Sequence, residues 1–284
     1  MKKAYILLLV LIIASIFIMR DFSYAATVGN SLDLDLPPRS ALLREEVIED
    51  AMDGYEQIVK IKAALDLEFI FDKDLHTSFE MQGAEIKGQW QMFKLGVTIF
   101  NRVEPYIKIG TSELDVKWNQ GPRTIEVGAD SGFAWGAGVK GVIWEFEDLG
   151  LRLTGDAQYR KTEPDVGDIS VSSVSVTDTG ADFNIKEWQA SLLLSRKFEV
   201  PLKWQNIYIV PYTGLSISDS TVDVSFIRAG DAADYSLFDA NNDEIYGFIL
   251  GCDIMPNLSS SFAYSMEVRL LSETSLTLGG AMKF

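Results

Sequence analysis

The sequence predicts an all-β protein: a transmembrane, antiparallel, up-and-down β-barrel of ten strands, with eight or twelve strands as alternatives. Apolar and polar residues alternate through most of residues 58–284, which gives each strand one apolar and one polar face. The alternating segments reach the length of about 9–11 residues that a tilted membrane strand needs. Short turns also alternate with longer polar connections, as in membrane barrels. Together these observations favour apolar faces that contact lipid over the inward apolar faces of a soluble β-sandwich.

The first 25 residues have the pattern of a cleaved secretory signal. Lys2 and Lys3 precede an apolar run over residues 4–19, and Ser23, Tyr24 and Ala25 follow it. This order of charged, apolar and cleavage regions is typical of signal peptides. A permanent membrane anchor is the alternative, although the run is slightly shorter than a typical spanning helix. We expect an exported chain that begins near residue 26.

Residues 26–57 predict a linker followed by a short amphipathic helix. Pro37 and Pro38 favour an extended linker. Leu43, Val47 and Ala51 then recur every four residues, which places them on one face of a helix. We expect this helix on the periplasmic side, against the barrel rim. A plug that enters the lumen is the alternative.

Residues 58–284 form the predicted barrel. Its ten strands are expected at residues 58–72, 89–100, 104–118, 124–146, 149–162, 183–197, 206–219, 244–255, 259–271 and 274–284. Residues 169–176 and 221–228 alternate as well, and we interpret them as strand extensions or hairpins above the membrane. If both segments cross the membrane instead, the barrel has twelve strands. Residues 113–127 predict a hairpin that turns at residues 119–122.

The polar faces of the strands are expected to line the lumen. Unpaired charges are costly in a narrow interior, so ion pairs should cross it. Bases outnumber acids among these lumen candidates: Lys62, Asp66, Glu68, Lys94, Lys108, Lys140, Arg152, Asp156, Arg160, Glu267, Arg269 and Lys283. One interpretation is a plugged interior that makes the barrel rigid. The other is a small water-filled pore whose weak preference is set by the basic excess.

The composition is acidic and excludes several classes of function. The chain carries 41 Asp and Glu against 25 Lys and Arg, a formal net charge of −16. We therefore expect no binding of nucleic acid through its phosphates, and we expect solvated acidic external loops. Cys252 is the single cysteine, which excludes an intramolecular disulfide and a cysteine-based zinc cluster.

The last predicted strand ends on an aromatic residue, with apolar residues or glycine at every second preceding position. These positions are Leu276, Leu278, Gly280, Met282 and Phe284. With the signal peptide and the alternating strands, this tail resembles bacterial outer-membrane β-barrel proteins of the small, porin-like class. The resemblance covers most of residues 58–284. It implies residence in the outer membrane, contact with its lipid, and recognition of the tail by the assembly machinery; Gly280 departs from the usual apolar residue.

Aromatic residues near the predicted strand ends fit the girdles that such barrels place at the two membrane interfaces. The candidates are Trp90, Phe100, Tyr106, Trp118, Trp135, Trp144, Phe146, Trp188, Phe198, Trp204 and Tyr246. Buried aromatic packing is the alternative for several of them.

Two predicted loops contain residues that could carry chemistry. His76, the only histidine, follows Asp74 at the spacing found in ten-stranded outer-membrane proteases, but no second aspartate pair matches. A solvated loop histidine is the alternative. Asp239, Asn241 and Asp243 alternate like the first ligands of a calcium loop, although the glycine and distal glutamate of that motif are missing. A solvated acidic loop is therefore the better interpretation of these three residues.

These observations lead to one main functional hypothesis and two alternatives. We expect a monomeric barrel without catalysis, cofactor or metal, which acts as a structural or surface-interaction protein. Its acidic external loops would meet an extracellular ligand. The alternatives are a small-solute diffusion channel and, least supported, an outer-membrane hydrolase that uses His76.

Overall fold

The computed structural model describes residues 59–77, 81–99, 102–146, 149–176, 182–201, 206–226, 235–255 and 262–284. The predicted signal peptide, linker and N-terminal helix lie outside these described residues. No helix formed by the described residues is long and apolar enough to span a bilayer, a finding that concerns helices alone.

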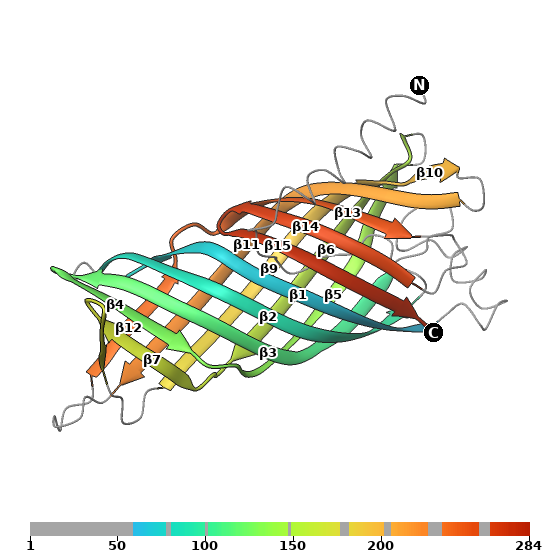
Figure 1. Cartoon of the computed structure of the whole chain (residues 1–284). Helices are drawn as coiled ribbons and strands as arrows, with labels where there is room; N and C mark the ends of the chain where they lie inside the picture. Colours follow the sequence, from blue (N-terminus) through green and yellow to red (C-terminus); the bar gives the residue numbers. More distant parts are fainter. Residues whose placement is uncertain are drawn as a thin grey trace.

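Ten antiparallel strands form a closed barrel (Figure 1). They are β1 (Val59–His76), β2 (Met81–Ile99), β3 (Val103–Gln120), β5 (Gly132–Phe146), β6 (Leu151–Thr162), β9 (Asp182–Arg196), β11 (Asn206–Phe226), β13 (Tyr246–Met255), β14 (Phe262–Leu271) and β15 (Thr274–Lys283). Each strand pairs with the next in this order, and β15 pairs with β1 from Lys283 to Thr274. The ring therefore has no free edge at this level, and the prediction of ten strands is confirmed.

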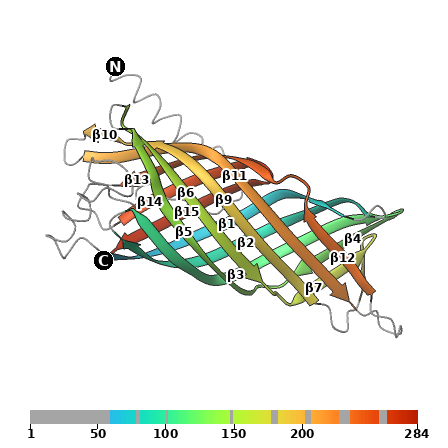
Figure 2. The same cartoon turned by 180° about the vertical axis from the view of Figure 1, so that it is seen from behind.

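Five shorter strands lie at the two ends of the ring. They are β4 (Arg123–Ala129), β7 (Val166–Val171), β8 (Val174–Val176), β10 (Phe198–Pro201) and β12 (Tyr235–Asn242). β4, β7, β8 and β12 extend one end, which we call the extended end (Figures 1 and 2). The other end contains the start of β1, the end of β15 and β10, and we call it the short-turn end. Residues 169–176 form most of the β7–β8 hairpin and residues 221–226 continue β11, so both are extensions, as predicted.

Two predicted boundaries are wrong because strands continue or break beyond the membrane. The segment predicted as one strand at residues 124–146 breaks near residue 131 into β4 and β5, and both pieces pair with β3. The long loop expected between residues 72 and 89 is instead a paired hairpin, with the ladder reaching Leu75 and Ala84. Backbone pairing thus continues where the sequence predicts loops.

The connection between β14 and β15 is short although it lies on the side of the longer elements, and this has a structural reason. The β14–β15 hairpin closes at Ser272 and Glu273, and both residues are buried. Above this hairpin, β12 returns from the extended end and pairs with β11 on one side and with β1 on the other. β12 therefore closes the ring at a level that β13, β14 and β15 do not reach.

The polarity of the two barrel faces inverts along β3. Toward the short-turn end, its inward side chains are polar and its outward ones apolar: Glu104, Tyr106 and Lys108 against Ile107 and Ile109. Toward the extended end the order reverses: Leu114, Val116 and Trp118 face inward, and Glu113, Asp115 and Lys117 face outward. β2 inverts at the paired level, near Gln91. This level marks the edge of the apolar outer band, because water replaces lipid beyond it.

A bulge in β1 exchanges the inward-facing and outward-facing positions of this strand. The register with β2 shifts between Ile70 and Lys73. Glu68 and Ile70 are buried before the bulge, and Lys73 and Leu75 are buried after it. An extra residue changes which alternate positions point inward. The inward face of β1 therefore moves from even to odd residue numbers.

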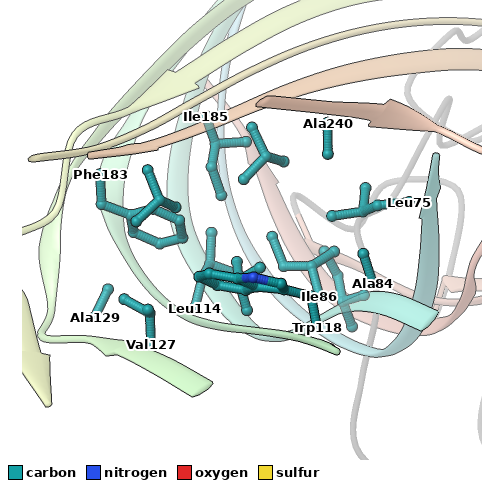
Figure 3. Packing of buried hydrophobic residues seen from close by; sticks show 14 of the residues in the cluster. Leu75, Ala84, Ile86, Leu114, Trp118, Val127, Ala129, Phe183, Ile185 and Ala240 are labelled. Carbon is teal, nitrogen blue, oxygen red and sulfur yellow. The ribbon is translucent and has the colours of Figure 1, made fainter. Parts of the chain in front are cut away.

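An apolar core fills the barrel toward the extended end (Figure 3). Its side chains come from β1, β2, β3, β4, β5, β7, β9, β11 and β12, and they include Leu75, Ile86, Trp90, Leu114, Trp118, Val127, Phe183, Ile185 and Ala240. Trp118 and Val127 are fully buried. Outside the membrane band, the barrel is thus held together by a dry interior like that of a soluble protein.

The close approach of β2 and β3 depends on glycine at position 110. A Cβ atom built on Gly110 would lie 1.9 Å from the backbone oxygen of Gln91, whereas one on Gly280 would have no neighbour within 4 Å. We expect Gly110→Ala to lower the free energy of unfolding by about 1–3 kcal/mol or more through this clash, and Gly280→Ala to leave it nearly unchanged. Urea titration of the detergent-folded barrel, followed by heat-modifiable gel mobility, measures the difference. Equal stability of the two variants would contradict the expectation.

Candidate functional site: a filled lumen and an acidic extended end

Buried charged side chains in the half of the barrel toward the short-turn end form what we call the lower ion-pair layer. Glu104 accepts from Lys62 at 2.9 Å and from Lys94 at 2.8 Å, and Lys140 lies 3.5 Å from it. Lys108 pairs with Asp66 at 3.0 Å, and the Tyr106 hydroxyl donates to Asp156 at 2.8 Å. The partners come from β1, β2, β3, β5 and β6, which are consecutive in the ring, so the layer lines one side of the lumen. Every one of these side chains is buried.

A second set of charges, the upper ion-pair layer, lies between the lower layer and the apolar core. Arg160 pairs with Glu68 and Glu187, and Lys73 donates to Glu187 at 2.6 Å. Lys73 also lies 3.4 Å from Glu273. Arg269 then joins Glu273 at 2.9 Å and Glu267 at 3.1 Å, and Ser220 and Tyr212 donate to Glu187 and Glu267. Three bases and four carboxylates thus form one connected network across the barrel.

Trp90 joins the upper ion-pair layer to the apolar core. The Arg160 guanidinium lies 4.4 Å from the centre of the indole ring of Trp90, a cation–π geometry. The cavity beside Trp90, Lys73 and Glu187 has a volume of only about 10 Å³, which is no more than the smallest cavity that can hold one water molecule. The described side chains therefore fill the lumen at this junction.

The structure brings together most of the residues predicted to line the lumen. Ten of them are buried members of the two layers: Lys62, Asp66, Glu68, Lys94, Lys108, Lys140, Asp156, Arg160, Glu267 and Arg269. Arg152 lies at the short-turn rim, half-buried, with its Nε 2.9 Å from Glu145. The side chain of Lys283 lies outside the described part of the structure.

Four further members of the layers were missed from the sequence. Simple alternation from the start of β1 would place Lys73 on the outward face, but the β1 bulge turns it inward. Glu104 is the first residue of a predicted strand, and Glu273 lies in the gap between two predicted strands. Glu187 had a usable signal, because Trp188, Ala190 and Leu192 alternate with polar residues around it. With these residues included, the layers contain seven bases and seven acids, so the predicted basic excess does not hold for them.

The outward face of the extended end carries an acidic groove. A hollow of about 430 Å³ crosses β2, β3, β4 and β7, and its charged lining is Glu85, Lys87, Asp115, Lys117, Glu126 and Asp168. Lys87 pairs with Glu85 at 3.1 Å and Lys117 with Glu126 at 3.2 Å. Partial burial raises the pKa of Asp115 above its ordinary value, and the nearby Glu113 and Glu126 raise it further. The groove therefore has a net negative character that a cationic group would relieve.

His76 ends strand β1 instead of lying in a free loop. Its ring is largely exposed, and its Nδ1 lies 3.5 Å from an Asp243 carboxylate oxygen. The polar residues Ser78 and Glu80 that follow it in the sequence lie outside the described residues. The hydrolase hypothesis gains no support from this geometry.

The three weak calcium candidates lie in the end of β12 and in the bend that follows it. Asp239 and Asn241 belong to β12, and Asp243 follows it. A calcium loop needs a sharp turn at this point. Within the described ranges, no group of three or more His, Cys, Asp or Glu side chains is placed to hold a metal ion.

The predicted assembly tail forms β15, at the seam with β1. Leu278 and Phe284 are exposed on the outer wall, whereas Leu276 is 7% exposed. Gly280 and Met282 take the intervening outward positions. The tail thus presents its alternating apolar row to the outside while its backbone closes the barrel.

The aromatic candidates divide between the outer wall and the interior. Six are exposed, as a girdle requires: Trp135, Trp144, Phe146, Trp188, Phe198 and Tyr246. Trp90, Tyr106 and Trp118 are buried inside, so their assignment to the girdle is wrong. The polarity inversion explains Trp90 and Trp118, because apolar side chains beyond it face inward. Phe100 and Trp204 lie outside the described residues.

Removal of Lys73 tests the upper ion-pair layer. We expect Lys73→Met to lower the free energy of unfolding by about 3–5 kcal/mol, because Glu187 and Glu273 lose a buried counter-charge. The double variant Lys73→Met/Glu187→Gln should recover part of this loss. Lys117→Met, which breaks an exposed pair with Glu126, should cost less than about 1 kcal/mol. Urea unfolding in detergent measures all three, and similar losses for Lys73→Met and Lys117→Met would refute the buried network.

The raised pKa of Asp115 predicts the sign of a pH effect at the extended end. Because the folded carboxyl binds its proton more tightly than the unfolded one, its contribution to stability is present at acidic pH and is lost as the pH rises through the folded pKa. Asp115→Asn should therefore be more stable than the natural chain at pH 7. The difference should vanish below the ordinary pKa of aspartate, near 3.9. Unfolding midpoints measured across this range check the sign, and a less stable variant at pH 7 would contradict it.

Comparisons with known proteins add little to this geometry. No protein-family model matches the chain. Among solved structures, the translocator domain of the autotransporter NalP from Neisseria meningitidis is similar at 10% identity and a TM-score of 0.35, over 84% of this chain and 93% of that one. The transport unit of the autotransporter AIDA-I from Escherichia coli is similar at 9% identity and a TM-score of 0.36, over 89% and 94%. Similarity at this level carries no argument about function. The closed ten-stranded ring, with its apolar outer band and polar interior, has the architecture of an outer-membrane β-barrel.

Proposed function

We propose that this chain is a non-conducting, non-enzymatic outer-membrane barrel that serves as a structural and surface-interaction protein. The filled lumen is the observation that carries this proposal. Two ion-pair layers and an apolar core lie in series along the barrel axis, and all three are made of buried side chains. A solute would pass the charges of the lower layer and would then have to break the upper layer and the apolar core.

The energetic cost of opening such a lumen supports the closed state. An ion that enters the upper layer must displace a partner of Lys73, Arg160 or Arg269, and each lost buried partner leaves a charge without compensation. Beyond this layer, the ion would meet Trp90, Leu114 and Ile185 of the dry core and would lose its hydration. The basic excess that favoured a selective pore is absent from the two layers. The channel hypothesis is therefore the weaker alternative.

The two ends of the barrel support an orientation. Outer-membrane barrels place short turns in the periplasm and longer elements outside the cell. By this rule the extended end is extracellular, and the predicted export signal delivers the chain to the periplasm. The acidic groove around Asp115 and Glu126 would then be available to partners. A cationic group on such a partner matches the charge of this surface.

Planar-bilayer recording tests the closed lumen. We expect the natural chain to show no discrete, stable openings. The charge-balanced variant Arg160→Ser/Glu187→Ser keeps the net charge and removes side chains of the upper layer only, so we expect it to stay silent because the apolar core still closes the lumen; small steps in this variant would show that the upper layer alone closes it. Stable openings of the natural chain would overturn the proposal.

Insertion must be checked independently, because a silent recording also follows from failed insertion. Heat-modifiable mobility of protein recovered from vesicles of the same lipid provides this check. Lys117→Ser/Glu126→Ser removes an exposed pair at the extended end and serves as the matched control, which should remain silent like the natural chain.

A further inference from the structure

The outer wall of the barrel has an apolar groove in addition to the filled lumen. It has a volume of about 650 Å³ and crosses the wall from β3 through β5, β6, β9 and β11 to β13. The strands that it crosses are neighbours in the sheet, and β5, β6, β9 and β11 run side by side in Figure 2. Its outward lining is apolar and includes Val139, Ile143, Leu192, Leu215, Ile217 and Tyr246, each at least 40% exposed.

Small residues in two adjacent rows make the floor of this groove. Gly141 pairs with Gly155 in one row, and Ala157 pairs with Ala190 in the next. The first row continues through Leu192 to Leu215, so the larger side chains stand at its end. The hollow therefore follows the hydrogen-bonding direction of the sheet, across the strands.

Gly155 is a glycine for a reason other than barrel closure. A Cβ atom there would meet only the ends of flexible side chains, Ile143 at 3.0 Å and Leu192 at 3.7 Å, whereas the same atom on Gly214 would lie 2.0 Å from backbone. Glycine inside a strand weakens it, because it has no side chain to pack. At position 155, the absence of a side chain keeps the groove open, and this offsets the loss of packing in the strand.

The dimensions of the groove fit one lipid chain. Six strands at a spacing of about 4.8 Å give a length of about 24 Å. Since strands of such barrels tilt by about 35–45°, a line across them rises by about 15 Å along the membrane normal. This rise matches one leaflet, which is about half of the 30 Å hydrocarbon core.

We propose that this groove binds one acyl chain of a membrane lipid as a specific site. The inference rests on the bilayer placement proposed above, and the medium around the outward apolar wall is then lipid hydrocarbon. A chain in the hollow contacts the protein from below and from both sides, so it gains more dispersion contacts than a chain on a convex wall. A second copy of the protein fits less well. Two hollows facing each other across a two-fold axis would enclose a void.

Photo-crosslinking in vesicles tests the site. The full-length processed chain is reconstituted in phosphatidylcholine vesicles in which a fraction of the lipid carries a diazirine on its acyl chain. After illumination, mass spectrometry maps the labelled peptides. We expect labelling of β5, β6, β9 and β11 near Val139, Leu192 and Leu215 to exceed that of the other strands several-fold.

Filling the groove supplies the decisive comparison. Gly155→Leu should lower the labelling of these strands at least fivefold, and Ala157→Phe provides a second filling variant if the first fails to fold. Ala63→Leu places the same leucine side chain at an outward position on β1, outside the groove, and should leave the pattern unchanged. Even labelling around all ten strands, or an unchanged pattern in a folded Gly155→Leu, would overturn the site. Protein–protein cross-links across the groove would overturn lipid as its occupant, and no labelling anywhere would reject the bilayer placement instead.

Discussion

Charge neutralisation inside the lumen is the constraint on which the rest of this structure depends. A narrow barrel with a polar interior buries every inward charge, and a buried charge is tolerated only with a partner. The partners are distant in sequence: Lys73 and Glu187 are 114 residues apart, and Arg160 and Glu68 are 92 residues apart. Such pairs meet only when the ring closes. Closure and neutralisation therefore occur together, because an open sheet would expose its polar face, and with it both sets of charges, to lipid.

Because of the polarity inversion, one part of the same strand faces lipid and the other part faces water. Near the short-turn end, β3 presents Ile107 and Ile109 outward and charges inward. A few residues later it presents Asp115 and Lys117 outward and Trp118 inward. Apolar and polar residues alternate with a period of two in both halves, but the phase changes between them: the apolar positions are odd-numbered at Ile107 and Ile109 and even-numbered from Leu114. A one-residue bulge would produce the same change of phase, so the pattern alone does not tell which face is which. Only the surrounding medium, lipid or water, decides the direction of the apolar side chains.

This ambiguity explains which parts of the structure could be predicted from the sequence. Strand number, the extensions at residues 169–176 and 221–226, and ten lumen residues follow from alternation, because they need only a period and a length. Trp90 and Trp118 were assigned outward because a change of phase within a strand is equally compatible with a bulge that keeps the apolar face outward. Lys73 was missed because a one-residue bulge exchanges the faces. Glu273 was missed because the buried β14–β15 turn makes sense only once β12 is known to close the ring above it.

A filled lumen moves function to the outer surfaces of the barrel. The ion-pair layers and the apolar core give the wall a rigid support, since side chains from opposite strands hold each other in fixed positions. A rigid wall can keep a hollow open where a soft one would collapse onto its small residues. Gly141 and Gly155 lie on the outside of strands whose inward neighbours, Lys140 and Asp156, are members of the lower ion-pair layer. The charges that seal the interior thereby also support the floor of the groove on the lipid-facing side.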